Sequence, residues 1–96
     1  MRLNIYTIFD SCSKTYQRPF FARSDGEALR SFGDIAADKE HPIGAHPEHY
    51  SIWRLGTFSD QDAEISVESA ECLGRAHDLV QNDNVTDFPL SPGGTA

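Results

Sequence analysis

The chain has 96 residues and a formal net charge of −7, a length that allows one small domain with a thin stability margin. Residues 1–30 contain five cationic side chains and three carboxylates, for a net charge of +2. Residues 31–96 contain three cationic side chains and twelve carboxylates, for a net charge of −9. An acidic chain repels nucleic acid at long range, which excludes strong DNA affinity and restricts any DNA contact to the N-terminal part.

Residues 2–9 alternate in a way that predicts a strand. One face carries Leu3, Ile5, Thr7 and Phe9, and the other carries Asn4, Tyr6 and Ile8. Large side chains on both faces predict a central strand that is partly covered on its second face. Polar residues 10–14 predict a turn, and residues 16–22 predict a second extended segment. Pro19 places that segment at a sheet edge or makes a strand begin there.

Residues 25–38 predict an amphipathic helix. Ser24 and Glu27 fit a capping box, in which each side chain bonds the backbone amide of the other residue. One apolar stripe recurs at helical spacing and comprises Ala28, Leu29, Phe32, Ile35 and Ala36. Gly33 costs about 1 kcal/mol inside a helix, which we expect close packing of the stripe to offset.

Residues 39–48 predict a loop, because three of the ten are Pro42, Gly44 and Pro47. Residues 50–58 and 63–67 predict a hairpin with a turn at 59–62, in which Asp60 and Asp62 bond their own backbone. Residues 69–80 show weaker helical spacing and predict a second helix. The polar residues 81–96 cannot bury enough apolar surface to order, so we expect a flexible tail.

The predicted order of elements is β-β-α-β-β-α. It indicates a single α+β domain over residues 1–80, with a four-stranded sheet packed by the 25–38 helix. Cys12 and Cys72 show no zinc-like spacing and predict free thiols, although a disulfide between them stays open. The N-terminal apolar run is short and broken, so we expect no signal peptide, no membrane span and a cytoplasmic protein.

No catalytic centre is predicted, and we expect neither an enzyme nor a cofactor. His41, His46 and His49, with Glu40 and Glu48 alongside, are the nearest approach to a metal site. They lie in a segment with prolines and no expected fixed geometry, so the sequence favours solvated or capping histidines and no metal. Paired carboxylates are explained by turns, and no phosphate-binding glycine loop occurs.

A basic and aromatic segment is the best candidate binding site. Aromatic rings can stack on bases while cations hold phosphates, so we expect nucleic-acid contact at Lys14, Arg18, Phe20, Arg23 and Arg30. The alternative is that one of Phe20 and Phe21 faces the core and the arginines only face solvent. Trp53 and Arg54 could extend such a face, although a tryptophan is more often part of the core.

Four motifs in order resemble the small non-structural protein of gokushoviruses, single-stranded DNA phages of the microvirus group. They are Tyr16 with Pro19-Phe20-Phe21-Ala22, Gly26-Glu27-Ala28-Leu29-Arg30-x-Phe32, His46-Pro47-Glu48-His49-Tyr50, and Leu55-Gly56-Thr57-Phe58-x-Asp60. His49 stands where the family pattern has an acidic residue, and the hairpin turn lacks a glycine. Several motifs also read as fold constraints, since Gly56 in a strand marks a bulge or a close approach.

The resemblance implies a non-structural accessory factor in the host cytoplasm. Its role would lie in genome replication, or in the switch to single-stranded DNA synthesis and packaging. The implied partners are single-stranded DNA, bound weakly, or a phage or host replication protein. The alternative is a protein–protein interaction module, such as a regulatory homodimer without nucleic-acid contact, which the acidic surface and an exposed hairpin edge favour.

Overall fold

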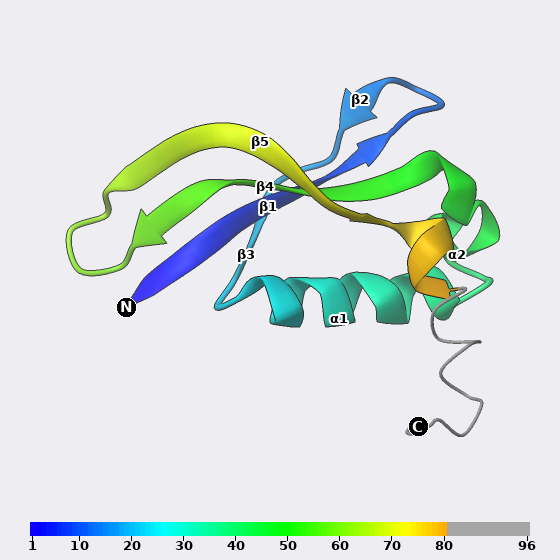
Figure 1. Ribbon diagram of the computed structural model, residues 1–96, viewed down its shortest axis with the longest axis horizontal. Helices are drawn as coiled ribbons and strands as arrows, with labels where there is room; N and C mark the ends of the chain where they lie inside the picture. The colour runs from blue at the N-terminus through cyan, green and yellow to red at the C-terminus, as the bar shows by residue number, and fades with distance from the viewer. Residues whose placement is uncertain (81–96) are drawn as a thin grey trace.

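An antiparallel sheet and one long helix form the computed structural model, which describes residues 1–80 (Figure 1). The strands are β1 (Arg2–Asp10), β2 (Thr15–Tyr16), β3 (Phe20–Ala22), β4 (Tyr50–Ser59) and β5 (Ile65–Arg75). The helical elements are α1 (Asp25–Ala37), the short α2 (Pro42–Ala45) and the 3-10 turn η1 (Pro47–His49). The predicted α+β class is therefore confirmed, and the predicted tail, 81–96, lies outside the described residues.

Strand β1 is central, as predicted. It pairs with β4 along its whole length on one side and with both β2 and β3 on the other. The second predicted strand is split in two, so the sheet has five strands and not four. Proline has no amide hydrogen to donate to a ladder, and residues 17–19 belong to neither strand, although the Gln17 amide still donates to the Ile8 carbonyl at 2.8 Å. The Thr7 hydroxyl donates to the Gln17 carbonyl at 2.6 Å and holds this break against β1.

Helix α1 covers one face of the sheet with the predicted stripe. Ala28, Phe32 and Ala36 are buried, and they form one core with sheet residues that include Tyr6 and Ile52. The Ser24 hydroxyl accepts from the Glu27 amide at 3.2 Å, as the capping box predicts. The reciprocal bond differs, because the Glu27 carboxylate accepts from the Arg23 amide at 2.8 Å instead of that of Ser24. The helix is nevertheless capped at its first turn.

The predicted loop at 39–48 is wrong in part, because α2 lies within it and η1 begins within it. Each begins at a proline, which tolerates the first helical position because its missing amide hydrogen would be unpaired there. His41 is the predicted capping histidine, since its Nδ1 accepts from the Ile43 amide at 3.1 Å. A Cβ on Gly44 would lie 1.8 Å from the Asp38 carbonyl oxygen, so only glycine lets α2 approach the end of α1.

The hairpin of β4 and β5 is confirmed, but the predicted helix at 69–80 is mostly wrong. Strand β5 continues to Arg75, and only residues 76–80 are helical. The long strand β4 has a free edge opposite β1. The second half of β5 pairs with this edge through Glu71, Cys72, Gly74 and Arg75. Ladder hydrogen bonds thus outweigh a weak helical preference that Gly74 lowers further.

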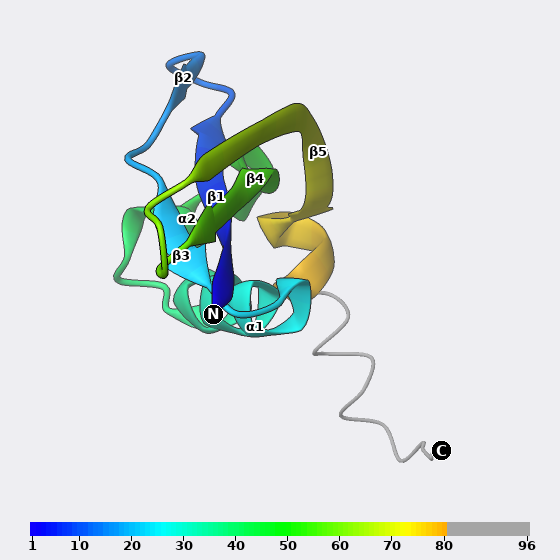
Figure 2. The ribbon, with the colours of Figure 1, turned by 90° about the vertical axis from the view of Figure 1, so that its left-hand side faces the viewer.

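Irregular pairing near Leu55 curves the sheet strongly. The register of β4 shifts against both neighbours beside this residue. Bulges bend and twist a strand, and Figure 2 shows β5 arching over β1 and β4. A Cβ on Gly56 would lie 2.0 Å from the Ser66 carbonyl oxygen, which confirms the predicted close approach at this glycine.

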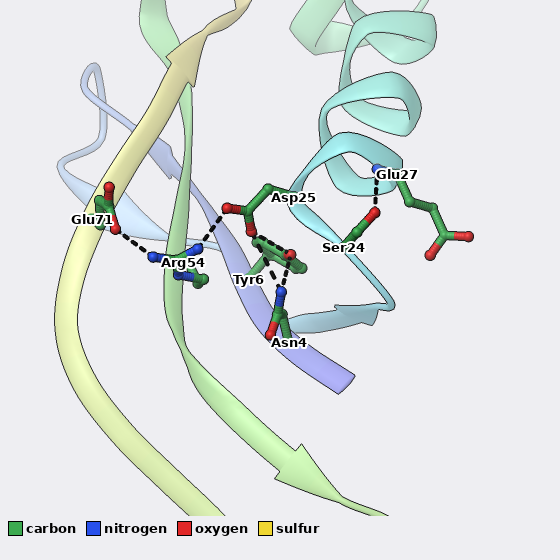
Figure 3. A network of polar contacts seen from close by, with 7 residues as sticks. All are labelled: Asn4, Tyr6, Ser24, Asp25, Glu27, Arg54 and Glu71. Atoms are coloured by element: carbon green, nitrogen blue, oxygen red, sulfur yellow. Dashed lines mark hydrogen bonds and ion pairs between the residues drawn. The ribbon is translucent and has the colours of Figure 1, made fainter. Parts of the chain in front are cut away.

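A polar network fastens the start of α1 to the sheet (Figure 3). The Asp25 carboxylate accepts from the Tyr6 hydroxyl at 2.7 Å and pairs with Arg54 at 2.5 Å. Arg54 also pairs with Glu71 on β5 at 2.5 Å, and the Asn4 amide donates to the Tyr6 oxygen at 2.9 Å. Burial, followed by the hydrogen bond to Asp25, raises the pKa of Tyr6 to about 12. This face of the sheet is therefore committed to holding α1.

Candidate nucleic-acid interface

The second face of the sheet, opposite α1, carries most of the exposed aromatic surface. Residues paired across antiparallel strands point to the same side, so each partner of a β1 residue shares its face. Within residues 1–80, no helix covers this face in either view (Figures 1 and 2). We call it the helix-free face; its residues include Leu3, Ile5, Thr7, Phe9, Tyr16, Phe21, Trp53, Phe58 and Val67.

Five aromatic side chains lie on the helix-free face. The rings of Phe9 and Tyr16 are 4.7 Å apart between centroids, and those of Phe21 and Phe58 are 5.5 Å apart. Tyr16 and Phe21 are each more than half exposed, at 56% and 51%. Trp53 is partly exposed and does not belong to the core, and its indole nitrogen donates to the Ser51 hydroxyl at 2.9 Å. Aromatic rings that pack against a neighbouring ring and keep an exposed surface can stack on planar groups.

Shallow hollows follow the helix-free face beneath the arch of β5. One of about 350 Å³ is lined by Ile5, Pro19, Phe21, Leu55, Ile65, Ser66, Val67 and Glu68. Its neighbour of about 420 Å³ shares Pro19 and Leu55 and extends to Thr7, Tyr16, Gln17 and Ala70. A third, of about 280 Å³, lies toward η1 and includes Phe9, Trp53 and Cys72 in its lining. The face is thus hollowed and largely apolar.

The structure divides the five residues that the sequence singled out. Lys14 lies in the turn between β1 and β2, and Arg18 precedes Pro19, which lines two of the hollows. Arg23 and Arg30 lie with α1, and Figures 1 and 2 place that helix far from the β1–β2 turn. All four cations are exposed, and the ion pairs found among residues 1–80 involve none of them.

The two adjacent phenylalanines point to opposite faces. Phe20 pairs with Tyr6, is partly buried against the core, and lies 5.7 Å from the Tyr6 ring between centroids. Phe21 pairs with Ile5 on the helix-free face and is the exposed member. The sequence left open which of them faces the core, and the structure assigns that place to Phe20.

The aromatic set of the helix-free face was missed because it depends on pairing between distant strands. Phe9 was placed correctly by the alternation of β1, whereas Phe58 joins it only through the register of β4. A period-two pattern indicates which residues of one strand share a face, but not which strands lie beside it. Ile5 and Thr7 are buried on this side, so the predicted partial cover of the second face is confirmed.

Cys12 and Cys72 are exposed and form no disulfide, as predicted. The Asp62 carboxylate accepts from the Glu64 amide at 3.1 Å, and this bond lowers the pKa of Asp62. Asp60 instead pairs with the terminal amine of Met1 at 2.6 Å. Among residues 1–80, no helix combines the length and the apolar character that crossing a membrane requires.

Comparison with known proteins gives one family. The family model described as "Phage ORF5 protein" matches residues 3–79, which span α1 and all the described strands except the first residue of β1. No curated protein and no solved structure matches the chain.

Proposed function

The chain belongs to the phage ORF5 protein family, and from this premise we propose that it binds single-stranded DNA on the helix-free face as a phage accessory protein. The observation that carries the proposal is the set of five aromatic side chains gathered on that face by strand pairing. Proteins that bind single strands without sequence preference stack successive bases on such rings. The role is one of binding and not of catalysis.

Charge limits how strongly this face can hold DNA. Lys14 and Arg18 lie on the β2 side of the sheet, whereas Glu68 lines a hollow of the same face. Single-strand affinity falls with the logarithm of salt with a slope of about −0.7 per neutralised phosphate. Two cations therefore give a slope of roughly −1.4, and stacking supplies most of the remaining affinity. Weak binding of this kind suits a factor that acts on DNA exposed at high local concentration.

We place this activity in phage genome replication, or in the switch to single-stranded DNA synthesis and packaging, in the host cytoplasm. The four ordered motifs that resemble the gokushovirus non-structural protein support this finer assignment, together with the family match over residues 3–79. A replication protein of the phage or host would supply the affinity that the acidic chain lacks.

The proposal is tested by fluorescence anisotropy with a labelled oligo-dT, at about 50 mM salt and in steps above it. Phe21→Leu is expected to weaken binding about tenfold, because one stacked base is worth about 1–3 kcal/mol. Phe20→Leu is the matched control, since the same change on the adjacent residue removes a ring from the α1 side. It should leave affinity unchanged.

A second matched pair separates the two groups of cations. Arg18→Gln should weaken binding and flatten the salt slope, while Arg30→Gln on α1 should do neither. Failure to bind at about 50 mM salt would overturn direct DNA contact. Equal losses in the two phenylalanine variants, or in the two arginine variants, would place the contact elsewhere than on the helix-free face.

A protein-interaction module is the second candidate, and the edge of β5 favours it. Strand β5 ends the sheet order, so its outer backbone groups have no strand partner among residues 1–80. Ile65 and Val67 are exposed on it, at 58% and 82%. A free edge with apolar side chains can add a strand from a second copy or another protein. Light scattering that shows a stable dimer, with no anisotropy change on DNA addition, would select this function.

A further inference from the structure

The turn that leads into β4 brings three possible metal ligands together. His46 precedes η1, and Glu48 and His49 lie within it. A 3-10 turn has three residues in each turn, so the side chains at positions i and i+3, here His46 and His49, lie on one side of it. No fixed geometry was expected for this segment from its prolines, and η1 provides one.

The ligand atoms lie close to the spacing that one metal ion requires. Glu48 Oε2 is 4.0 Å from His46 Nδ1 and 3.6 Å from His49 Nε2, and one donor atom from each of the three residues lies within 4.8 Å of the others. Ligands at about 2.0–2.1 Å from a tetrahedral ion stand about 3.3 Å from one another. Side-chain adjustments of an ångström or so therefore close the set around one ion.

Backbone hydrogen bonds hold this turn in place before any ion arrives. The His49 amide donates to the His46 carbonyl at 3.1 Å, and the His49 carbonyl accepts from the Ser11 amide at 2.8 Å. The His46 amide donates to the Pro42 carbonyl at 3.1 Å, which joins the turn to α2. The three side chains thus start from a backbone anchored to β1 on one side and to α2 on the other. Such preorganisation lowers the entropy cost of binding.

We propose that His46, Glu48 and His49 bind one divalent first-row transition ion, with Zn²⁺ as the representative ion. Two imidazoles and one carboxylate form a donor set that suits zinc and its neighbours and that does not suit the oxygen-seeking Mg²⁺ or Ca²⁺. Three protein ligands leave a fourth position for water or for an added group.

We expect the fourth position to face the hollow of about 280 Å³ at the end of the helix-free face. Glu48 and His49 belong to the lining of this hollow, together with Trp53, Cys72 and Arg75. An anionic group that enters the hollow would meet both the bound cation and the Arg75 side chain. The metal site stands independently of the proposed DNA contact, since its ligands lie outside the aromatic set.

The test is isothermal titration of untagged protein with Zn²⁺, without DNA, and the expected result is saturable binding of one ion per chain. His46→Gln, Glu48→Gln and His49→Gln should each weaken binding at least about tenfold, because even outer partners of a metal site are worth roughly 10- to 100-fold in affinity. Cobalt supplies a second readout, since Co²⁺ in a four-coordinate site gives a strong visible absorption that an octahedral aqueous ion lacks.

The matched control is His77→Gln, which removes an exposed histidine from the helical residues 76–80. This variant should retain the affinity of the unchanged protein within about twofold, since costs of about tenfold or more belong to ligands and the groups that contact them, and His77 is not one of the three clustered residues. Circular dichroism of each variant checks that the fold is kept. Absence of one-to-one binding, or equal weakening in His77→Gln and His49→Gln, would overturn the proposal. DNA binding that persists in His49→Gln leaves the proposed function intact, so the two proposals can fail separately.

Discussion

Gly33 and Gly44 differ in how strongly their surroundings require a glycine. Gly33 lies within α1, and a Cβ built there would meet no atom within 4 Å. The stripe expected to offset its cost is packed, since Ala28, Phe32 and Ala36 are buried, but no neighbouring atom requires a glycine at this position. At Gly44, in contrast, an added Cβ would lie 1.8 Å from the Asp38 carbonyl oxygen, so the approach of α2 to α1 requires glycine. Only the three-dimensional surroundings distinguish the two.

Gly33→Ala is expected to stabilise the protein. Alanine is favoured over glycine in a helix interior by about 1 kcal/mol, and the added methyl group meets no neighbour. A gain of this size raises Tm by about 4–8 °C in a domain of this length. Thermal unfolding followed by circular dichroism measures the change.

Gly44→Ala is the matched control and should destabilise by about 1–3 kcal/mol, the usual cost of forcing extra atoms into a packed site. The opposite signs of the two substitutions are the informative result. A Gly33→Ala protein that melts at a lower temperature than the unchanged protein would show that α1 packs more closely at this position than the structure indicates.

At the scale of the element, the sequence correctly predicted the helices and strands that short local patterns determine. The helix at 25–38 has a cap, an apolar stripe and acidic residues in its first turn, and it forms as α1. The hairpin has turn-forming aspartates between two runs of β-formers and also forms. The second half of β5 was mispredicted, because its conformation comes from pairing with β4 and not from its own spacing. Pro19 was expected at a sheet edge or at the start of a strand, and β3 begins directly after it at Phe20.

Arg54 joins three elements, and its loss should loosen the attachment of α1. It is 27% exposed and pairs with Asp25 at the start of α1 and with Glu71 on β5. Arg54→Met keeps the aliphatic stem and removes both bonds. The expected loss is about 1 kcal/mol, because the Asp25 and Glu71 carboxylates are 36% and 59% exposed and ion pairs open to solvent are worth roughly 0–1 kcal/mol each. Urea unfolding at neutral pH measures the loss.

Arg30→Met serves as the control for Arg54→Met, since Arg30 is exposed on α1 and forms none of the ion pairs among residues 1–80. It should change the free energy of unfolding by less than about 0.5 kcal/mol. Equal effects of the two substitutions would mean that the network of Figure 3 contributes nothing beyond the general charge of the helix.

At the scale of the whole molecule, the two faces of the sheet have different tasks. One is filled by α1 and the polar network, while the other combines exposed aromatic rings with hollows beneath β5. The sequence located the basic N-terminal part and its cations, but it could not tell that Lys14 and Arg18 lie on either side of β2 while Arg23 and Arg30 lie with α1. The sequence shows which segments of the chain are charged. The face of the sheet on which those charges lie depends on the fold.

The proposed DNA contact on the helix-free face predicts that removing the Glu68 charge strengthens DNA binding more than removing the Asp34 charge. Glu68 lines the hollow beside Phe21, whereas Asp34 is exposed on α1. Glu68→Gln and Asp34→Asn each raise the net charge by one unit, so they are matched in total charge.

A unit charge about 10 Å from a phosphate in water costs about 0.4 kcal/mol, or about twofold in affinity. Anisotropy at low salt, where the Debye length is about 30 Å at 0.01 M, should show this gain for Glu68→Gln and a smaller one for Asp34→Asn. Equal gains would mean that DNA responds to net charge alone, and no gain from Glu68→Gln would remove DNA from the helix-free face.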